Sequence, residues 1–402
     1  MSGPLPDPST AHLRRLVAGR SLADREGVPI ESADLDEAAA GGLGVDAVTD
    51  RVEATLQDIS DRMPPDEVGD PRDFHRALGI LLRETRRAAG KLDADPTAPL
   101  SRGEAIAFEA VIRTDGTRPT MLVRDDAVDT NHPLAGDWAG TLTATRDRMR
   151  DRMGAVGRIE PANATARSFF GTGWVVDSAK GLVLTNLHVL EAMWRRLSHV
   201  MVRTQTGFRV LDGAFIDFAG ESGRTRTNRF RIVEAKPSGV DGPGLARLDA
   251  AVLTMEPTRQ GEQEFPAAIP VLADPDGPSG NLASFCVVGF PGPPAFTGGV
   301  HEGVDWTWVN ATLFGNRYGV KRLAPGIAHR PLGSLAGDGR GWVFGHDPTT
   351  LGGSSGSPVF NWLDAAPGSF GLHFAGASVD TNIAHAVAAC ATELRAIGVP
   401  VP

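Results

Sequence analysis

Hydrophobic positions in the first hundred residues recur at helical spacing. The first series is Val48, Val52, Leu56, Ile59 and Met63. Its members are three or four residues apart, so they lie on one face of a helix. Pro64 and Pro65 end this helix, because proline removes a backbone donor and clashes with the preceding turn.

A second helix is predicted directly after this break. Asp70 is its N-cap and Pro71 occupies the first helical position, where proline is tolerated. Its buried stripe consists of Leu78, Leu81 and Leu82, and Gly90 is its predicted end. Residues 1–97 are therefore expected to form a helical domain of their own.

Residues 98–156 have a mixed pattern and are predicted to be a bridging segment that packs on the C-terminal unit of the chain. "EAVIRTDGTRPTMLVRDDAVD" predicts two short strands around a turn at Asp115-Gly116. "DWAGTLTATRDRMRDRMGAV" predicts one helix.

From residue 157 to residue 402 the pattern becomes that of short strands separated by glycine- and proline-rich turns. "SFFGTGWVVDSAKGLVLTNLHVL" predicts two strands with a turn near Gly181, and "RFRIVEA", "DAAVLTM" and "SFCVVGF" predict three more. Many short strands of this kind are typical of a sandwich or a pair of barrels. The chain is therefore expected to be a multidomain α+β protein, with a helical unit before an all-β unit.

Composition sharpens this division. Residues 1–100 hold 12 Lys and Arg against 19 Asp and Glu, a net charge of −7 out of −9 for the whole chain, and a single aromatic residue, Phe74. An acidic chain gains no electrostatic attraction to nucleic acid or to an anionic membrane, so neither is expected as a partner.

The sequence predicts a reducing, cytoplasmic location. No apolar run is long enough to span a bilayer, and "MSGPLPDPSTAHLRRL" lacks the apolar core of a signal peptide. Secreted proteins of this size usually carry more cysteines than the two found here, Cys286 and Cys390. The sequence does not tell whether these two pair.

The stretch "LGGSSGSPVF" contains the strongest candidate for a nucleophile. Ser355 has Gly353 two positions before it and Gly356 directly after it. Glycine before a serine nucleophile allows a tight turn, and the N–H groups of Gly353 and Ser355 would then form an oxyanion hole. Ser354 and Ser357 lack this arrangement of glycines, and the strand-like "SPVFNW" directly afterwards is not typical of a solvated linker.

A serine hydroxyl needs a histidine to accept its proton and a carboxylate to orient that histidine. His188 lies at the end of the apolar stretch "GLVLTNLHVL", which we interpret as a strand, and Asp249 leads into the strand "AAVL". A structural histidine and a surface aspartate are the alternative interpretations. Asp217 in "FIDF" is a weaker carboxylate candidate than Asp249, because phenylalanines flank it on a short strand.

The blocks "GTGWVVDSAKGLVLTNLHVL", "LDAAVL" and "TLGGSSGSPVF" resemble the three signature blocks of trypsin-like serine proteases of the chymotrypsin fold, in the same order His, Asp, Ser. The bacterial intracellular members are more similar than the digestive ones. The resemblance implies a double six-stranded β-barrel over residues 157–402. It also implies the catalytic roles of His188 as base, Asp249 as orienting residue and Ser355 as nucleophile.

The resemblance also suggests what the protein cleaves. "GLHFAG" is similar to the segment that lines the specificity pocket of glutamyl endopeptidases, where a histidine and a threonine meet the acidic side chain of the substrate. His373 and Thr350 occupy those two positions. Residue Thr349 stands where trypsin-like enzymes that cleave after Lys or Arg have an aspartate, so cleavage after Glu, or less readily Gln, is expected.

Three functional hypotheses remain open at this level. The first is a serine endopeptidase acting on protein or peptide substrates, whose helical domain recruits a protein partner or regulates access, as in bacterial conflict and defence systems. The second is a protease-fold scaffold or latent enzyme without turnover, and the third is an enzyme held inactive by residues 100–155. No metal or cofactor is expected, since the sequence has no close-spaced His and Cys cluster and no phosphate-binding glycine loop.

Overall fold

The computed structural model describes residues 117–130, 132–165, 168–224, 227–242, 244–256, 264–274, 284–294, 300–301, 304–335, 337–378 and 381–402. The two helices predicted within residues 1–97, and the turn predicted at Asp115-Gly116, lie outside the described residues.

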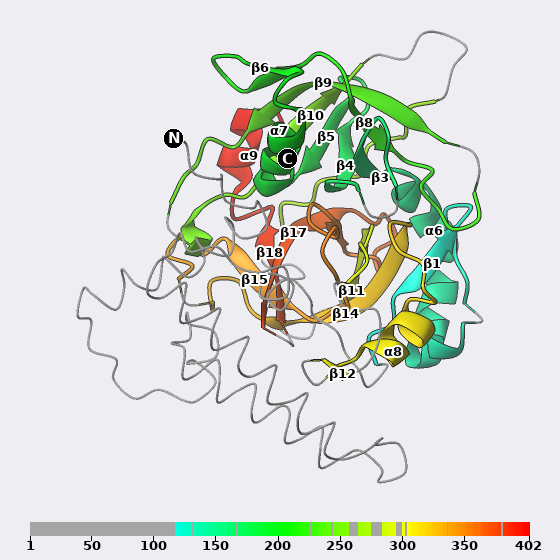
Figure 1. The fold of residues 1–402 in the computed structure, drawn as a ribbon. Coiled ribbons are helices and arrows are strands. Elements are labelled where there is room, and N and C mark those ends of the chain that lie inside the picture. Colours follow the sequence, from blue (N-terminus) through cyan, green and yellow to red (C-terminus); the bar gives the residue numbers. More distant parts are fainter. Residues whose placement is uncertain are drawn as a thin grey trace.

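Two closed antiparallel barrels of six strands each dominate the fold, which confirms the predicted double β-barrel of the chymotrypsin type (Figure 1). The first barrel runs in the order β3 (Val156–Pro161), β4 (Gly171–Asp177), β5 (Leu182–Thr185), β10 (Ala251–Met255), β9 (Arg229–Pro237) and β8 (Ala214–Asp217), and closes by pairing β8 with β3. The second runs in the order β11 (Ser284–Gly289), β14 (Arg322–Arg330), β15 (Val343–His346), β18 (Thr381–Ala386), β17 (Ser369–Ser378) and β16 (Pro358–Phe360), and closes by pairing β16 with β11.

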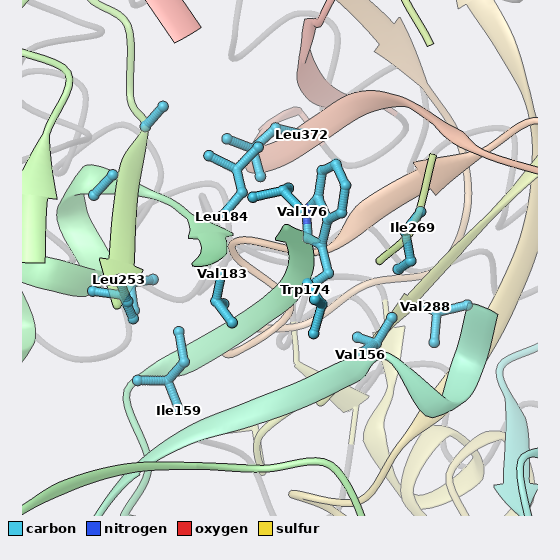
Figure 2. Close-up of a cluster of buried hydrophobic side chains, with 14 of the residues drawn as sticks. Val156, Ile159, Trp174, Val176, Val183, Leu184, Leu253, Ile269, Val288 and Leu372 are labelled. Atoms are coloured by element: carbon cyan, nitrogen blue, oxygen red, sulfur yellow. The ribbon is translucent and has the colours of Figure 1, made fainter. Parts of the chain in front are cut away.

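Apolar side chains fill the interior of the first barrel and continue toward the second. Ile159, Trp174, Val183 and Leu253 come from four strands of the first barrel and are fully buried (Figure 2). Val288 and Leu372, from strands β11 and β17 of the second barrel, belong to the same buried cluster. The burial of this surface is the main favourable contribution to folding, and it fixes the two barrels against each other.

The residues before the first barrel extend the sheet of the second one. Strand β1 (Met121–Arg124) pairs with β14, and β2 (Ala127–Val128) returns along β1. The turn of this hairpin lies at Asp125 and Asp126, which both have positive φ, near 50°, a conformation that aspartate tolerates better than most residues. This hairpin was not predicted from the sequence, and the predicted turn at Asp115-Gly116 lies outside the described residues.

Helix α6 (Ala139–Gly154), which comes after the 3₁₀ helix η1 (Pro133–Trp138), completes this segment. Its buried residues are Leu142, Thr145, Met149 and Met153, spaced as one helical face. At its C-terminal end, Lys321 donates from its buried ammonium group to the carbonyl of Met153 (2.7 Å) and to that of Phe218 (2.8 Å) in the first barrel. One buried cation thus joins the bridging segment to both barrels.

Shorter elements decorate the barrels. They are α7 (Leu187–Leu197), β6 (Met201–Arg203), β7 (Phe208–Val210), η2 (Gly244–Ala246), β12 (Val300–His301), β13 (Val304–Asp305), α8 (Trp306–Trp308), η3 (Val309–Leu313) and α9 (Ala391–Ile397). Helix α9 lies against the first barrel, where Lys236 of β9 donates to the carbonyl of Ala396 (2.8 Å) (Figure 1).

Cys286 and Cys390 are both buried and free, so they do not form a disulfide. Within the described ranges, no helix combines the length and the apolar character needed to cross a membrane.

Candidate active site

Ser355 lies in the loop that connects β15 to β16, which we call the Ser355 loop (residues 347–357). Successive tight turns shape it: the Ser354 N–H donates to the carbonyl of Leu351 (3.0 Å) and the Ser357 N–H to that of Ser354 (3.0 Å). The loop is tied to β17 by the Gly356 N–H, which donates to the carbonyl of His373 (2.9 Å).

Two glycines of this loop have left-handed backbones and no room for a side chain. Gly353 has φ 95°, and a Cβ there would lie 2.7 Å from the Phe169 ring. Gly356 has φ 89°, and a Cβ there would lie 2.0 Å from the carbonyl oxygen of Thr172. The glycines around Ser355 are therefore required by this turn.

The backbone N–H groups of Gly353 and Ser355 lie on either side of the bonded N–H of Ser354. No hydrogen bond within the part of the chain that the structure describes uses the N–H of Gly353 or that of Ser355, while the Ser354 N–H between them is bonded to Leu351. Two unused donors beside a serine are what an oxyanion hole requires.

His188 lies in the first turn of α7, directly after β5, rather than at the end of a strand as the sequence suggested. After Asn186 the apolar residues follow helical rather than strand spacing. The buried face of the helix consists of Val189, Leu190, Met193 and Leu197. This correction changes the element that carries His188, while its position just after β5 stays as predicted.

Asp249 holds His188 by two hydrogen bonds. One carboxylate oxygen accepts the backbone N–H of His188 (2.9 Å), and the other lies 2.6 Å from Nδ1 of its ring. Because a carboxylate only accepts, Nδ1 carries the proton, and Nε2 of the neutral ring is unprotonated. The Asp249 side chain is 3% exposed, so water competes little for this hydrogen bond.

The backbone of Asp249 is held as well. Its carbonyl accepts from the side-chain amide of Asn186 (2.8 Å), and its N–H donates to Nε2 of His385 on β18 (3.0 Å). Burial lowers the pKa of His385 to about 4, which keeps Nε2 an acceptor at neutral pH. Sequence reasoning missed both residues, since neither is near Asp249 in the chain.

Gly171 brings the histidine and serine segments together. The Thr172 N–H donates to the carbonyl of Ser355 (2.9 Å), which attaches the Ser355 loop to β4. A Cβ on Gly171 would lie 2.7 Å from Val189, the neighbour of His188, and 3.1 Å from the Ser355 carbonyl. Gly171 thus lies between the side chain that follows His188 in the sequence and the backbone carbonyl of Ser355.

The two predicted specificity residues are both buried, Thr350 in the Ser355 loop and His373 on β17. Thr350 donates its hydroxyl proton to the side-chain oxygen of Asn382 on β18 (2.7 Å), and Asn382 in turn donates to the Pro348 carbonyl (2.6 Å). His373 is attached to the Ser355 loop through its backbone N–H, which donates to Ser357 (3.0 Å). Among the described residues, no hydrogen bond joins Thr350 to His373 directly.

His373 begins a row of histidines that sequence reasoning did not anticipate. Its Nδ1 lies 3.3 Å from Nε2 of His346 on β15, and His329 of β14 adds a repulsive charge to His346. Burial, with a contribution from the neighbouring His188, lowers the pKa of His373 to about 3. Burial also lowers the pKa of His346 well below its usual range. The imidazoles of His373 and His346 are therefore neutral at physiological pH.

Other sequence features have structural roles. Asp217 accepts from the backbone N–H groups of Ala219 (2.9 Å) and Asn228 (3.0 Å), so its carboxylate closes a turn of the first barrel. Across the described ranges, no cluster of three or more His, Cys, Asp or Glu could hold a metal ion. A cavity of about 470 Å³ near Arg317 and Tyr318 is lined by none of the predicted site residues.

Comparison with known proteins agrees with the fold. Residues 171–365 match the family described as a trypsin-like peptidase domain. A probable serine protease of Lysobacter enzymogenes is 41% identical over 338 residues, covering 83% of this chain and 86% of that protein.

Two solved structures are also similar. One is a scabies mite inactivated protease paralogue, S-D1 (13% identity, TM-score 0.40, covering 61% of this chain and 93% of that chain). The other is an inactive mutant form of Rv3671c from M. tuberculosis H37Rv (17% identity, TM-score 0.35, covering 68% and 94%). The identity and coverage of the Lysobacter relative, together with the two barrels and the matched peptidase domain, establish that this chain belongs to the trypsin-like serine proteases.

Proposed function

We propose that the protein is an endopeptidase that works through an acyl-enzyme on Ser355, with His188 as general base and Asp249 as the residue that orients it. The observation that carries this proposal is the pair of hydrogen bonds from Asp249 to the ring and the backbone of His188, in a nearly dry site. Such a contact favours the imidazole tautomer which the chemistry needs.

The proposed reaction follows from these positions. The Oγ of Ser355 attacks the scissile carbonyl carbon while His188 Nε2 accepts the hydroxyl proton. The N–H groups of Gly353 and Ser355 stabilise the negative charge that develops on the carbonyl oxygen. His188 then gives its proton to the leaving amine, which frees the C-terminal product. Water attacks the acyl ester by the same route and regenerates Ser355.

Covalent labelling tests this assignment. A fluorophosphonate probe should modify the wild-type protein and Ser354→Ala, and should not modify Ser355→Ala. Ser354→Ala is the matched control because its side chain is the adjacent hydroxyl in the same loop. A wild-type protein that resists labelling would favour the latent or scaffold alternative, and labelling that survives in Ser355→Ala would assign another nucleophile.

We propose further that the substrate has Glu before the scissile bond. What supports this is a buried, neutral His373 attached to the Ser355 loop, with Nδ1 occupied by His346, so that Nε2 is the ring atom left to donate to a substrate carboxylate. The absence of a carboxylate at position 349 agrees with it, since Thr349 instead donates its hydroxyl to the Arg118 carbonyl (2.6 Å).

A peptide library measures this preference. We expect kcat/KM for Glu to exceed that for Lys or Arg at least tenfold. His373→Ala should remove most of the preference while the rate of fluorophosphonate labelling, which needs no acidic side chain, stays within a few-fold of wild type. Equal rates on Glu and Lys substrates would refute the assignment of His373.

We also propose that the acidic residues 1–97 recruit a protein partner or regulate access, as in bacterial defence proteins of similar layout, and that the site of action is the cytoplasm. The support for this is sequence pattern alone. Residues 117–155 share the core of the barrels, which favours a structural role for this part of the bridging segment over pure inhibition. Activity of the full chain, measured with and without residues 1–97, tests the regulatory role.

A further inference from the structure

The bridging segment reaches the base of the Ser355 loop through one arginine. Nη2 of Arg118 lies 2.7 Å from a carboxylate oxygen of Asp347, the first residue of that loop, and the two side chains are 17% and 4% exposed. An ion pair at this depth holds its geometry far better than one on the surface, because water competes little for either partner.

Asp347 is also hydrogen-bonded to the second barrel. Its other carboxylate oxygen accepts the N–H of Ile327 on β14 (2.8 Å), and its own N–H donates to the Ile327 carbonyl (3.3 Å). Arg118 is held in return at its backbone, where its carbonyl accepts the hydroxyl of Thr349 (2.6 Å). Two interactions, an ion pair and a hydrogen bond, therefore join the segment before the first barrel to the start of the Ser355 loop.

A second contact from the same segment lies beyond the other end of the loop. The indole N–H of Trp138 donates to the Thr117 carbonyl (2.9 Å), and the Arg118 guanidinium lies 5.6 Å above the Trp138 ring. Trp138 packs in turn against Trp362, just after strand β16 (ring centroids 5.9 Å apart). Arg118 and Trp138 thus contact the chain on both sides of Ser355.

The Ser355 loop needs such anchors because it contains no strand or helix of its own. Between Asp347 and Ser357 it passes through two left-handed glycines, and the N–H groups proposed for the oxyanion hole are part of this same stretch. A shift at its first residue is transmitted to those donors, and misplacement of about 1 Å at a reacting centre is enough to lower a rate by about a hundredfold.

We infer that Arg118 and Asp347 are a positioning pair, which sets the Ser355 loop in its working geometry from outside the barrels. The inference rests on the proposed role of Ser355. On this inference, residues before the first barrel help to set the geometry of the active site. Displacement of Arg118 would then lower activity.

The test uses full-length variants Arg118→Ala, Asp347→Asn, the double variant and Arg118→Lys. The readouts are the second-order rate constant of fluorophosphonate labelling, kcat and KM on a peptide substrate, and the thermal unfolding midpoint. Arg124→Ala is the matched control, since Arg124 is an exposed arginine of the adjacent strand β1 and lies outside the contacts that anchor the loop.

We expect Arg118→Ala to lower kcat and the labelling rate at least tenfold in protein that remains folded at the assay temperature, with KM changed much less. The double variant should be no slower than the slower single variant, Arg118→Lys should recover part of the loss, and Arg124→Ala should match wild type.

Two results would overturn the inference while leaving the proposed function intact. One is a labelling rate in Arg118→Ala equal to that of the wild type. The other is a loss that is fully explained by the unfolded fraction, or that adds in the double variant as for two unrelated sites. A wild-type protein that does not label at all refutes the proposed function itself, so the two failures are distinguishable.

Discussion

At the scale of single residues, the site depends on positions where no side chain fits. A Cβ at Gly356 would lie 2.0 Å from a backbone carbonyl oxygen, whereas one at Gly223, which has almost the same φ of 83°, would meet nothing within 4 Å. A side chain at Gly223 would therefore meet backbone strain alone, whereas one at Gly356 would meet the same strain and a steric collision.

This difference gives a prediction for two alanine variants. Gly223→Ala should lower the free energy of unfolding by about 1 kcal/mol, because alanine is strained in the left-handed region. Gly356→Ala should lower it by about 3 kcal/mol or more and abolish fluorophosphonate labelling, because the Ser355 loop has to move away from β4. Urea unfolding and labelling measure both, and equal effects of the two variants would contradict the collision argument.

The residues that sequence could identify are those with a local signature. Ser355 lies among glycines, and His188 and Asp249 lie beside apolar runs, so their neighbours in the chain mark them as candidates. Three other residues contact the candidate site or the Ser355 loop, and their neighbours in the sequence do not distinguish them from ordinary polar positions. They are Asn382, His385 and Arg118, which lie 27, 30 and 237 positions from Ser355. Only the closure of the barrels gives them a role.

At the scale of elements, strands were more predictable than their ends and connections. Strands β9, β10 and β11 lie at the short apolar runs that predicted them, because runs of this length between glycine- and proline-rich turns are buried in the barrel walls. The hairpin turn at Asp125-Asp126 and helix α7 were not predicted, since short apolar runs fit a strand and a helix equally well until long-range contacts decide.

Helix α6 illustrates how much the segment before the barrels contributes. Met149 is 1% exposed on its inner face, while Asp147, two positions earlier, is exposed. Met149→Ala should lower the free energy of unfolding by about 2–5 kcal/mol through lost burial and a cavity. Asp147→Ala should change it by less than about 0.5 kcal/mol.

Urea unfolding of the two α6 variants at pH 7 provides the measurement. A small effect of Met149→Ala would mean that the helix packs loosely against the protease. The corresponding loss of cooperativity would appear as a separate early transition assigned to residues 117–155.

At the scale of the whole molecule, the buried histidines make stability depend on pH. His346, His373 and His385 have pKa values lowered in the folded state, to about 3 for His373 and about 4 for His385, while an unfolded chain restores values near 6.5. The unfolded state then binds more protons than the folded state below pH 6.5, so stability is fully present above that pH and is lost as the pH falls toward 4.

The size of this effect and its origin can both be tested. Each histidine that stays neutral when folded costs about 2 kcal/mol between pH 7 and pH 5, at about 1.36 kcal/mol per pH unit once the unfolded form is protonated. His346→Gln should therefore flatten the pH dependence of the unfolding free energy by about that amount, and His199→Gln, at an exposed position, should leave it unchanged. Identical slopes in the wild type and His346→Gln, from urea titrations at pH 7, 6 and 5, would show that His346 is protonated in the folded protein.

In that case His346 would be a cation 3.3 Å from the ring of His373. The proposed contact between His373 and an acidic substrate would then be supported by this positive charge rather than by a neutral imidazole.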